Sequence, residues 1–266
     1  MPSVLSIAGS DPSGGAGIQG DLKTFAALGV YGCAVPTALT AQSTRGVREV
    51  LPVPAPFVTR QLETLLDDVE VAAVKIGMLG DAAVVRAVAA ALRRYAPPHV
   101  VLDPVLRASA GGVLLDDDGL AALRDELLPL VDLVTPNAVE AGALLGAAPP
   151  RTGEDAGHAA LGIVALGTGA ALVTGGHLHD PTTCVDVLAT RAGLHAFRTA
   201  RVEGGGAHGT GCALSSAIAA LLARGRELPD ACAEAQEIVA QAVRDGRQLS
   251  VGHGTRPVHV QSRARQ

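Results

Sequence analysis

The sequence has 266 residues, of which 48% are hydrophobic, and this is enough for one large α/β domain with a sizeable core. Its formal net charge is −5 and only 2% of its residues are aromatic, so it offers neither a basic surface for phosphate backbones nor many rings for base stacking. The composition therefore argues against nucleic acid as a partner and favours a small ligand.

The N-terminal stretch MPSVLSIAGSDPSGG has no basic region, and the letters GSD interrupt its apolar run. It predicts neither a signal peptide nor a membrane span, so we expect a cytoplasmic chain. The four cysteines are Cys33, Cys184, Cys212 and Cys232. They contain no CxxC pair, which argues against a zinc site or a disulfide framework and favours reduced thiols. The polar C-terminal tail is expected to fray after Val260.

Short β-prone runs alternate with longer helical patterns along the chain. In order they are VLSIAG, GIQGDLKTFAALGV, GCAVPTAL, VAAVKIGML, DAAVVRAVAAALRRY, HVVLDPV, LVDLVTPN, AALVTGG and a helix near Cys212. This alternation is typical of βαβ units on a parallel sheet, and no repeat or change of composition divides the chain. We therefore predict one doubly wound α/β domain over residues 1–266, with its ligand at the carboxyl ends of the strands.

Three shorter patterns predict local structure. The stretch CVDVLATRAGLHAFR predicts a β-hairpin beside the site, with its turn at residues 191–193. The run Asp116–Asp118 predicts the start of a surface helix. His177 and His179 are interpreted as part of a hairpin rather than a metal site, because the sequence suggests no third ligand.

The first glycine loop follows the first predicted strand, and Gly15, Gly17 and Gly20 fit the dinucleotide pattern GxGxxG. A dinucleotide site also needs an acid about 20 residues later, whereas this chain has none there before Glu49. We therefore favour a loop that lets the backbone approach a small ligand, with Asp21 in the first turn of the next helix. The alternative is that these glycines only form a turn.

The second glycine loop is GGGAHGTGCALSSAIAALLARG, residues 204–225. No Gly-Lys-Ser/Thr follows, so it is not a Walker A loop, but it runs into an apolar helix that Gly225 should end. Free N–H groups at such a helix start bind anions, which favours a phosphate cradle. Cys212 lies at this positive end, where the pKa of a thiol is expected to fall. A nucleophile paired with His208 and a small buried hydrophobic residue remain alternatives for Cys212.

Polar residues follow two of the later predicted strands. Asp103 ends one strand, and Asn137 and Glu140 follow another. Their oxygen atoms are the hard ligands that Mg²⁺ takes beside a triphosphate. Asn137 and Glu140 also fit a capping box, and both interpretations can hold together. Lys75 is expected at a strand end near the site.

The motifs LSIAGSDPSGGAGIQGDLKTFAALGVYG, TALTAQSTRGV, KIGMLG, VLDPV, TPNAVEAGALLG and HGTGCALSSAIAAL resemble those of the hydroxymethylpyrimidine/phosphomethylpyrimidine kinases of thiamine biosynthesis, in the ribokinase-like superfamily. The resemblance runs from about Val4 to Pro257. It implies a three-layer α/β/α fold with a mostly parallel sheet, and usually a homodimer. It also implies the cofactors ATP and Mg²⁺ and two successive phosphorylations, of 4-amino-5-hydroxymethyl-2-methylpyrimidine and then of its monophosphate.

The resemblance also implies roles for single residues. Substrate binding falls to Gly9, Asp21, Gln42 and Met78, with Gln42 hydrogen-bonded to the aminopyrimidine. Nucleotide binding falls to Asp103, Asn137, Thr174 and Gly176, and Mg²⁺ binding to Asp103 and Glu140. The anion hole and catalysis fall to Gly209, Thr210, Gly211 and Cys212, with Cys212 where related sugar kinases have an aspartate base. No covalent intermediate is needed, because phosphoryl transfer depends mainly on positioning and charge.

The chain departs from the family pattern at three places. Thr174 stands where members usually have a lysine that contacts ATP phosphates, Gly206 and Ala207 replace an Asn-Thr pair, and residues 109–111 replace Lys-Ser-Gly. Losing a charge at the phosphates would lower activity unless an arginine such as Arg107 or Arg191 supplies it. Two alternatives stay open. One is a pyridoxal or pyridoxine kinase, because similar folds phosphorylate the hydroxymethyl group of that ring, and the other is a pyrimidine-binding homologue with weakened catalysis, which Thr174 supports.

Overall fold

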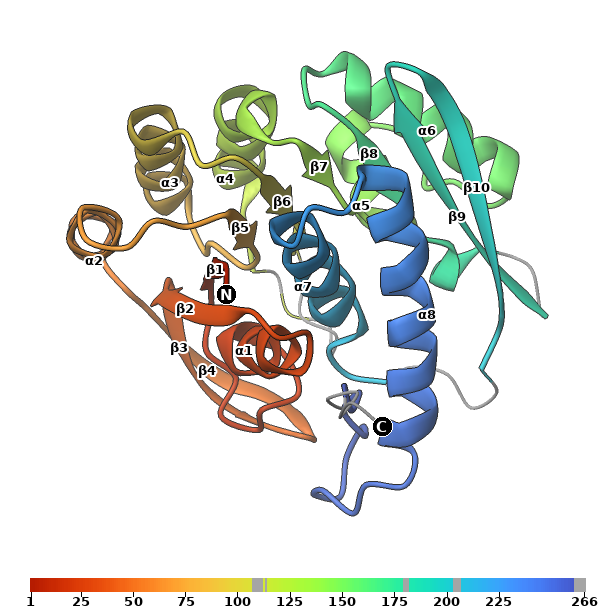
Figure 1. The fold of residues 1–266 in the computed structure, drawn as a ribbon, viewed down its shortest axis with the longest axis horizontal. Helices are drawn as coiled ribbons and strands as arrows, with labels where there is room; N and C mark the ends of the chain where they lie inside the picture. Colours follow the sequence, from red (N-terminus) through yellow and green to blue (C-terminus); the bar gives the residue numbers. More distant parts are fainter. Residues whose placement is uncertain (107–111, 113, 179–181, 203–206, 261–266) are drawn as a thin grey trace.

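The computed structural model describes residues 1–106, 112, 114–178, 182–202 and 207–260, and one sheet lies between two layers of helices (Figure 1). Eight strands of these residues form the sheet, in the order β10-β9-β8-β7-β6-β5-β1-β2. They are β1 (Ser3–Ala8), β2 (Tyr31–Pro36), β5 (Ala73–Ile76), β6 (Val100–Leu102), β7 (Leu133–Val134), β8 (Ala171–Val173), β9 (Thr183–Thr190) and β10 (Gly193–Ala200). The six strands β2, β1, β5, β6, β7 and β8 are parallel to one another. β9 is antiparallel to β8, and β10 is antiparallel to β9. The predicted three-layer α/β/α fold is confirmed.

The two helical layers differ in composition. One layer holds α1 (Gly17–Ala27), α7 (Thr210–Ala223) and α8 (Leu228–Gly246). The other holds α2 (Ala55–Leu66), α3 (Ala82–Tyr95), α4 (Asp117–Ala122), η1 (Leu123–Leu127), η2 (Leu128–Leu130), α5 (Ala138–Leu145) and α6 (Gly153–Ala165). Each layer covers one face of the sheet, so each strand needs apolar side chains on both faces.

The strands meet this need by alternation, since successive side chains point to opposite faces of a sheet. In β1, Val4 packs in the core of the α1, α7 and α8 layer, whereas Leu5 and Ile7 pack in the core of the other layer. Ser6 and Lys75 occupy positions on the α1 and α7 face, where apolar residues would be expected. These two polar side chains mark the place where the core meets the site.

The strand order reverses beside β1, because β2 pairs on one side of it and β5 on the other. Ligands of open α/β sheets bind at the carboxyl ends of strands at such a reversal. Gly9 follows β1 and Met78 follows β5, and a Cβ atom at Gly9 would lie 3.0 Å from the Met78 sulfur. The predicted position of the ligand therefore coincides with two of the predicted substrate residues.

A second, two-stranded sheet lies outside the main one and was not predicted. Its strands are β3 (Ala38–Ser43) and β4 (Gly46–Pro52), which are antiparallel and joined by a two-residue turn. The alternating pattern of LTAQS and VREVL around a turn with Gly46 was the available signal. This hairpin carries Gln42 to the site.

The predicted hairpin near the C-terminal half exists, but its turn does not flank the site. β9 and β10 are joined at Arg191 and Ala192, and Gly193 already belongs to β10. Ala171 pairs with Ala189 and Val173 with Val187, so this turn lies at the amino end of β8. The carboxyl ends of the parallel strands are at the opposite edge, and Arg191 therefore cannot replace a charge at the site.

Two smaller predictions also have outcomes. Asp116 does begin a helix, since its side chain accepts a hydrogen bond from the Gly119 N–H. His177 lies in a 3₁₀ turn, η3 (Gly175–His177), rather than in a hairpin, and His179 lies outside the described residues, as do Arg107, residues 109–111, Gly206 and the tail after Val260.

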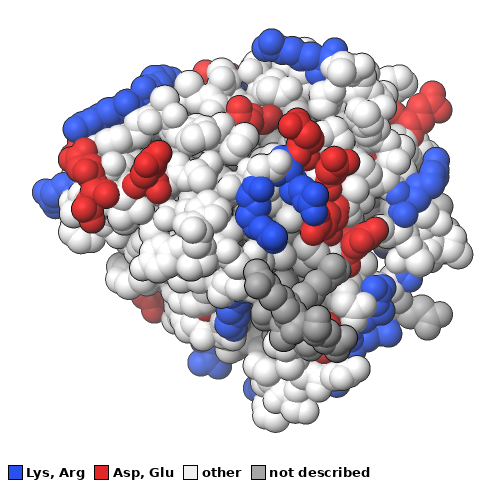
Figure 2. All heavy atoms as spheres, viewed as in Figure 1, with Lys and Arg blue, Asp and Glu red and all other residues white. Residues whose placement is uncertain are grey.

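No helix in the described part of the chain combines the length and the apolar character that crossing a membrane requires. On the face shown in Figure 2, basic side chains are interspersed with acidic ones, and those described there form no continuous basic strip.

Candidate active site

The two glycine loops contact each other at the carboxyl edge of the sheet. Gly209 has φ +87° and Gly17 has φ +56°, a region that favours glycine. A Cβ atom at Gly209 would overlap the Gly15 carbonyl oxygen, and one at Gly17 would overlap the Gly9 carbonyl oxygen. Gly17 is thus required by close backbone approach within the first loop, and Gly209 by close approach between the two loops, which holds the start of α7 next to the loop that follows β1.

Helix α7 points its N-terminus at the predicted anion site. Gly209 is the N-cap and offers no side chain to the helix, and the Thr210 hydroxyl donates to the Ala207 carbonyl at 2.8 Å. Gly211 is exposed, and a Cβ atom there would lie 3.4 Å from Asp103 Oδ2. Because the first N–H groups of a helix have no intrahelical acceptor, this turn can bind an anion beside Asp103. At the other end Gly225, with φ +81°, follows the helix as predicted.

Cys212 does not have the lowered pKa that its helix position predicts. Burial raises the pKa of its thiol to about 12, and the Asp103 and Asp21 carboxylates raise it further, while Lys75 acts in the opposite direction. The expectation of a lowered pKa is wrong because desolvation and two nearby carboxylates outweigh the helix end and the lysine. In the free protein, Cys212 therefore carries a neutral thiol.

The carboxylates of Asp103 and Glu140 are both buried, and the Asp103 charge acts on Glu140. Burial and the Asp103 carboxylate raise the pKa of Glu140 to about 8, and burial raises the pKa of Asp103 although Lys75 opposes this. Asn137 begins α5 and forms the predicted capping box: Glu140 Oε2 accepts from the Asn137 N–H at 2.9 Å, and Asn137 Oδ1 accepts from the Glu140 N–H at 3.0 Å. The capping interpretation is confirmed.

These two carboxylates fit the chemistry of a magnesium site. Both groups hold a proton more tightly than usual because of burial, and a divalent cation would relieve their repulsion. The residues described hold no cluster of three or more His, Cys, Asp or Glu side chains suited to a metal. Two carboxylates are nevertheless enough for Mg²⁺, which keeps several waters and takes oxygen atoms from substrate phosphates.

Asp21 occupies a different place from the one predicted. It lies in the second turn of α1, and its side chain is fully buried. It accepts from Lys75 Nζ at 2.9 Å, from the Ser6 hydroxyl at 2.6 Å and from the Ser216 hydroxyl at 2.8 Å. These partners leave no exposed surface for a ligand, so direct contact between Asp21 and the substrate is not supported.

Lys75 was predicted near the site, and it lies there, but with its side chain fully buried in β5. Its partner was not foreseen, although a charged residue inside the apolar run VAAVKIGML was a signal of a buried ion pair. The positive charge lies beneath the site and acts on both Cys212 and Asp103.

The predicted nucleotide residues Asn137 and Thr174 are neighbours, linked by a parallel bridge between their backbones. The turn that follows contains Gly176, and Arg201 donates to the carbonyls of Gly176 at 2.9 Å and Leu178 at 3.2 Å. Asp186 accepts from the N–H of Gly175 at 2.6 Å in the same turn. The sequence did not predict Arg201 or Asp186, because Asp186 lies in the antiparallel strand β9 and Arg201 directly follows β10, far along the chain from this turn.

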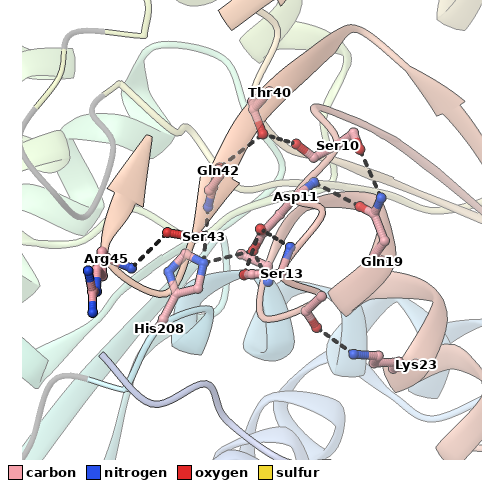
Figure 3. A network of polar contacts seen from close by, with 12 residues as sticks. Ser10, Asp11, Ser13, Gln19, Lys23, Thr40, Gln42, Ser43, Arg45 and His208 are labelled. Atoms are coloured by element: carbon pink, nitrogen blue, oxygen red, sulfur yellow. Dashed lines mark hydrogen bonds and ion pairs between the residues drawn. The ribbon is translucent and has the colours of Figure 1, made fainter. Parts of the chain in front are cut away.

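Gln42 belongs to a polar network drawn in Figure 3. Its amide lies 3.2 Å from Thr40 Oγ1 and 3.2 Å from His208 Nε2, and His208 Nε2 also lies 2.8 Å from Asp11 Oδ2. The Nε2 atom of His208 is thus engaged by Asp11 and Gln42. This geometry favours a structural role for His208 over a nucleophilic pair with Cys212.

The C-terminal segment closes over this network. The His208 N–H donates to the Arg256 carbonyl and the His208 carbonyl accepts from the Val258 N–H, each at 3.0 Å. The Thr255 N–H donates to the Thr44 carbonyl at 2.8 Å, in the turn between β3 and β4. Residues 251–260 therefore tie the loop before α7 to the hairpin that carries Gln42.

Comparison with known proteins shows the family to which this chain belongs. Residues 11–259 match the model of a family described as phosphomethylpyrimidine kinase. The chain is 48% identical over 257 residues to a hydroxymethylpyrimidine/phosphomethylpyrimidine kinase of Escherichia coli K12, covering 97% of this chain and 96% of the relative.

Two solved structures are also similar. A phosphomethylpyrimidine kinase from Clostridium difficile 630 has a TM-score of 0.81 and 35% identity, with 91% of this chain and 100% of that one covered. A pyridoxal kinase from Staphylococcus aureus, in complex with AMP-PCP and pyridoxal, has a TM-score of 0.90 and 31% identity, with 100% of this chain and 95% of that one covered.

Proposed function

Because the chain belongs to the phosphomethylpyrimidine kinase family, we propose that it phosphorylates 4-amino-5-hydroxymethyl-2-methylpyrimidine and then its monophosphate, with ATP as donor, in thiamine biosynthesis. It is a phosphotransferase with a ribokinase-like fold. The reaction belongs in the cytoplasm, a reducing compartment that suits four free cysteines.

The observation that carries this proposal is the N-terminus of α7 beside Asp103. The N–H groups at Gly209, Thr210 and Gly211 have no acceptor within α7 and supply donors for the transferring phosphoryl group, and the neighbouring Asp103 supplies a carboxylate. Phosphoryl transfer needs little covalent help from the protein, so fixed donors aimed at the developing charge provide most of the catalysis. Mg²⁺, when bound, would be held by Asp103 and Glu140 and would offset the negative charge of the ATP phosphates.

Because its thiol is neutral, Cys212 positions the substrate at the start of the reaction. The thiol forms a hydrogen bond with the substrate hydroxymethyl group and holds the hydroxyl oxygen for in-line attack. Gly9 and Met78 pack against the pyrimidine ring, and Gln42 binds the polar edge of the ring. The alcohol loses its proton late, to an oxygen of the transferred phosphoryl group, because a loose transition state places little negative charge on the attacking oxygen. This differs from an early deprotonation by a thiolate, which the raised pKa of Cys212 disfavours.

The nucleotide lies, in this proposal, along Asn137, Thr174 and Gly176. Thr174 lacks the charge of the lysine usual at this position, and Arg201 is the described cation that contacts the same turn. Its guanidinium is occupied by carbonyl groups, so its effect would be to fix the turn rather than to bind phosphate.

The test is ADP release from MgATP, with hydroxymethylpyrimidine, its monophosphate and pyridoxal offered separately to the purified protein. Turnover with both pyrimidines is expected. Turnover with pyridoxal alone would move the protein to the pyridoxal kinases, whose solved structures are similar in fold. Binding without turnover on all three would indicate a pyrimidine-binding homologue in which Thr174 has cost the activity.

We also propose that two copies associate through the β3–β4 sheet. Leu39 and Leu51 pair across these strands, and they are 49% and 61% exposed. Large apolar side chains exposed together are typical of a surface that another chain covers. Sedimentation analysis should find a dimer for the natural chain and a monomer for the variant Leu39→Glu/Leu51→Glu; a monomeric natural chain would contradict this.

A further inference from the structure

In the polar network around Gln42, each end of the side-chain amide faces a partner of the wrong hydrogen-bonding type. Turning the amide by half a turn would correct both ends. Gln42 Nε2 lies 3.2 Å from His208 Nε2, and Gln42 Oε1 lies 3.2 Å from Thr40 Oγ1. The direction of an amide is decided by its partners, because its oxygen and nitrogen have nearly the same shape. The partners at the two ends of the Gln42 amide are His208 and Thr40 (Figure 3).

Asp11 fixes the proton on His208. Asp11 Oδ2 lies 2.8 Å from His208 Nε2, and the Asp11 carboxylate also accepts from the Ser13 N–H at 2.9 Å and from the Ala16 N–H at 2.9 Å. Although burial opposes it, hydrogen bonds from His208 and Ser13 hold the pKa of Asp11 below its usual range. A carboxylate only accepts hydrogen bonds, so His208 must carry its proton on Nε2. The amide nitrogen of Gln42 would then face another donor.

Thr40 fixes the other end of the amide. Its hydroxyl lies 2.8 Å from the Ser10 carbonyl oxygen, which can only accept. The single hydroxyl proton is thereby used, and Thr40 Oγ1 can only accept from Gln42. The amide oxygen of Gln42 would then face another acceptor.

We propose that His208 is a positioning residue that sets the direction of the Gln42 amide, with the carbonyl oxygen towards His208 Nε2–H and the NH₂ group towards Thr40 Oγ1. The His208 Nε2–H can be shared as a three-centre hydrogen bond between Asp11 Oδ2 and an oxygen of Gln42. A half-turn of the amide therefore gives Gln42 a share of the His208 proton and lets its NH₂ group donate to Thr40 Oγ1, and it moves no other atom. It leaves one N–H and one oxygen lone pair of Gln42 free for a ligand.

This direction matters for the substrate, and here the inference rests on the proposed function. The edge of a 4-aminopyrimidine presents an amino donor next to a ring nitrogen acceptor, which matches the free acceptor and donor of one amide. If the amide turned round, the ring would have to turn with it, and the hydroxymethyl group next to the amino group would move away from Cys212. His208 thus selects the ring orientation that permits phosphorylation.

The first test compares two variants of His208. His208→Leu keeps the volume but removes the donor, and it should raise the KM for hydroxymethylpyrimidine about tenfold while the KM for ATP stays within about twofold. His208→Gln places an amide N–H near the position of Nε2 and should restore most of the affinity. His158→Leu, on the exposed surface of α6, is the matched control and should change neither value.

The second test asks whether His208 acts through Gln42. In a Gln42→Ala background, His208→Leu should cause no further loss, because the amide that it directs is absent. An equal loss in both backgrounds, or an unchanged KM in His208→Leu, would overturn the proposal. Should His208→Leu fail to fold, Thr40→Val in the two backgrounds makes the same comparison from the other end of the amide.

The proposed function and this inference can fail separately. If the natural chain does not phosphorylate the pyrimidine, calorimetric binding of the unreactive ligand 4-aminopyrimidine still measures the Gln42 contacts. Weaker binding in His208→Leu that His208→Gln restores would then support the inference alone. Equal binding by all three proteins would reject it, whatever the outcome for catalysis.

Discussion

Cys212 illustrates how the surroundings of a residue can outweigh its place on a helix. It lies in the first turn of α7, where the helix end favours a thiolate, yet burial and the Asp103 and Asp21 carboxylates raise its pKa to about 12. The sequence could predict the helix and the position of the cysteine, because both follow from local pattern. It could not predict the sign of the pKa shift, because the carboxylates come from α1 and from the end of β6.

The raised pKa predicts low thiol reactivity at Cys212. At pH 7.5 its thiolate should be roughly three-thousandfold less abundant than that of a free thiol with a pKa near 8.5. Alkylation by iodoacetamide, followed by mass spectrometry of the peptide that contains Cys212, should be correspondingly slow and should still accelerate above pH 9. Alkylation as fast as that of a model peptide at pH 7.5 would show that the thiol is ionised.

Glu140 predicts a specific dependence of stability on pH. Its pKa is raised from 4.5 to about 8 in the folded chain, so the folded state binds the proton more tightly than the unfolded state. The resulting stabilisation is complete below pH 4.5 and is lost as the pH rises to about 8. One pKa unit corresponds to about 1.4 kcal/mol, so the loss should be a few kcal/mol.

Urea denaturation of the natural chain and of Glu140→Gln, without Mg²⁺, measures this effect. The glutamine keeps an acceptor for the Asn137 N–H but cannot ionise, and Asp103 titrates in both proteins. The two proteins should have similar unfolding free energies near pH 4.5, and the variant should be the more stable at pH 8. A variant that is less stable at pH 8 would contradict the raised pKa.

At the scale of the elements, the contact between the two glycine loops gives a sharp comparison. Gly209 and Gly225 have similar dihedrals, with φ +87° and +81°, but only Gly209 has a neighbour that a Cβ atom would overlap. Gly225→Ala should therefore cost about 1 kcal/mol of unfolding free energy, from the backbone conformation alone. Gly209→Ala should cost several kcal/mol or displace the start of α7.

Urea denaturation and ADP release separate these effects. Gly225→Ala should keep its turnover, and Gly209→Ala should lose more than tenfold, because the donors of the anion site move with the helix. Equal stability and turnover in the two variants would mean that the loops do not meet as closely as the structure has them.

Elements with strong local patterns were predictable, and those defined by distant contacts were not. The helix over Ala82–Tyr95 and the strand over Ser3–Ala8 follow from their periodicity. The hairpin of β3 and β4 was missed, because its strands pair only with each other and have few buried side chains to show the pattern. Its contribution to the site was nevertheless implied by the motif around Gln42.

At the scale of the whole molecule, four elements from both halves of the sequence meet at a buried ion pair. Asp21 on α1 and Lys75 on β5 meet at 2.9 Å, and Ser6 on β1 and Ser216 on α7 complete the set. All four side chains are fully buried beneath the site. The expectation that Asp21 binds the substrate came from its motif, whereas the fold gives its carboxylate four protein hydrogen bonds instead.

Breaking this pair from one side should be far more damaging than replacing it. Lys75→Met leaves a buried carboxylate without its counter-ion and should cost about 3–5 kcal/mol of unfolding free energy. The double variant Lys75→Met/Asp21→Asn removes both charges and should recover much of that loss, as measured by urea denaturation. A single variant as stable as the natural chain would mean that the pair contributes nothing.

The C-terminal segment affects the order in which the protein folds during its synthesis. Its backbone holds His208 on both sides, through Arg256 and Val258, about 50 residues further along the chain. A ribosome that adds 5–20 residues per second needs several seconds to make that stretch. During this interval the growing chain already contains Gln42, Asp103 and Cys212 with β3, β6 and α7, but the His208 backbone still lacks its hydrogen bonds to Arg256 and Val258. Recognition of the pyrimidine is therefore among the last properties that the nascent protein acquires.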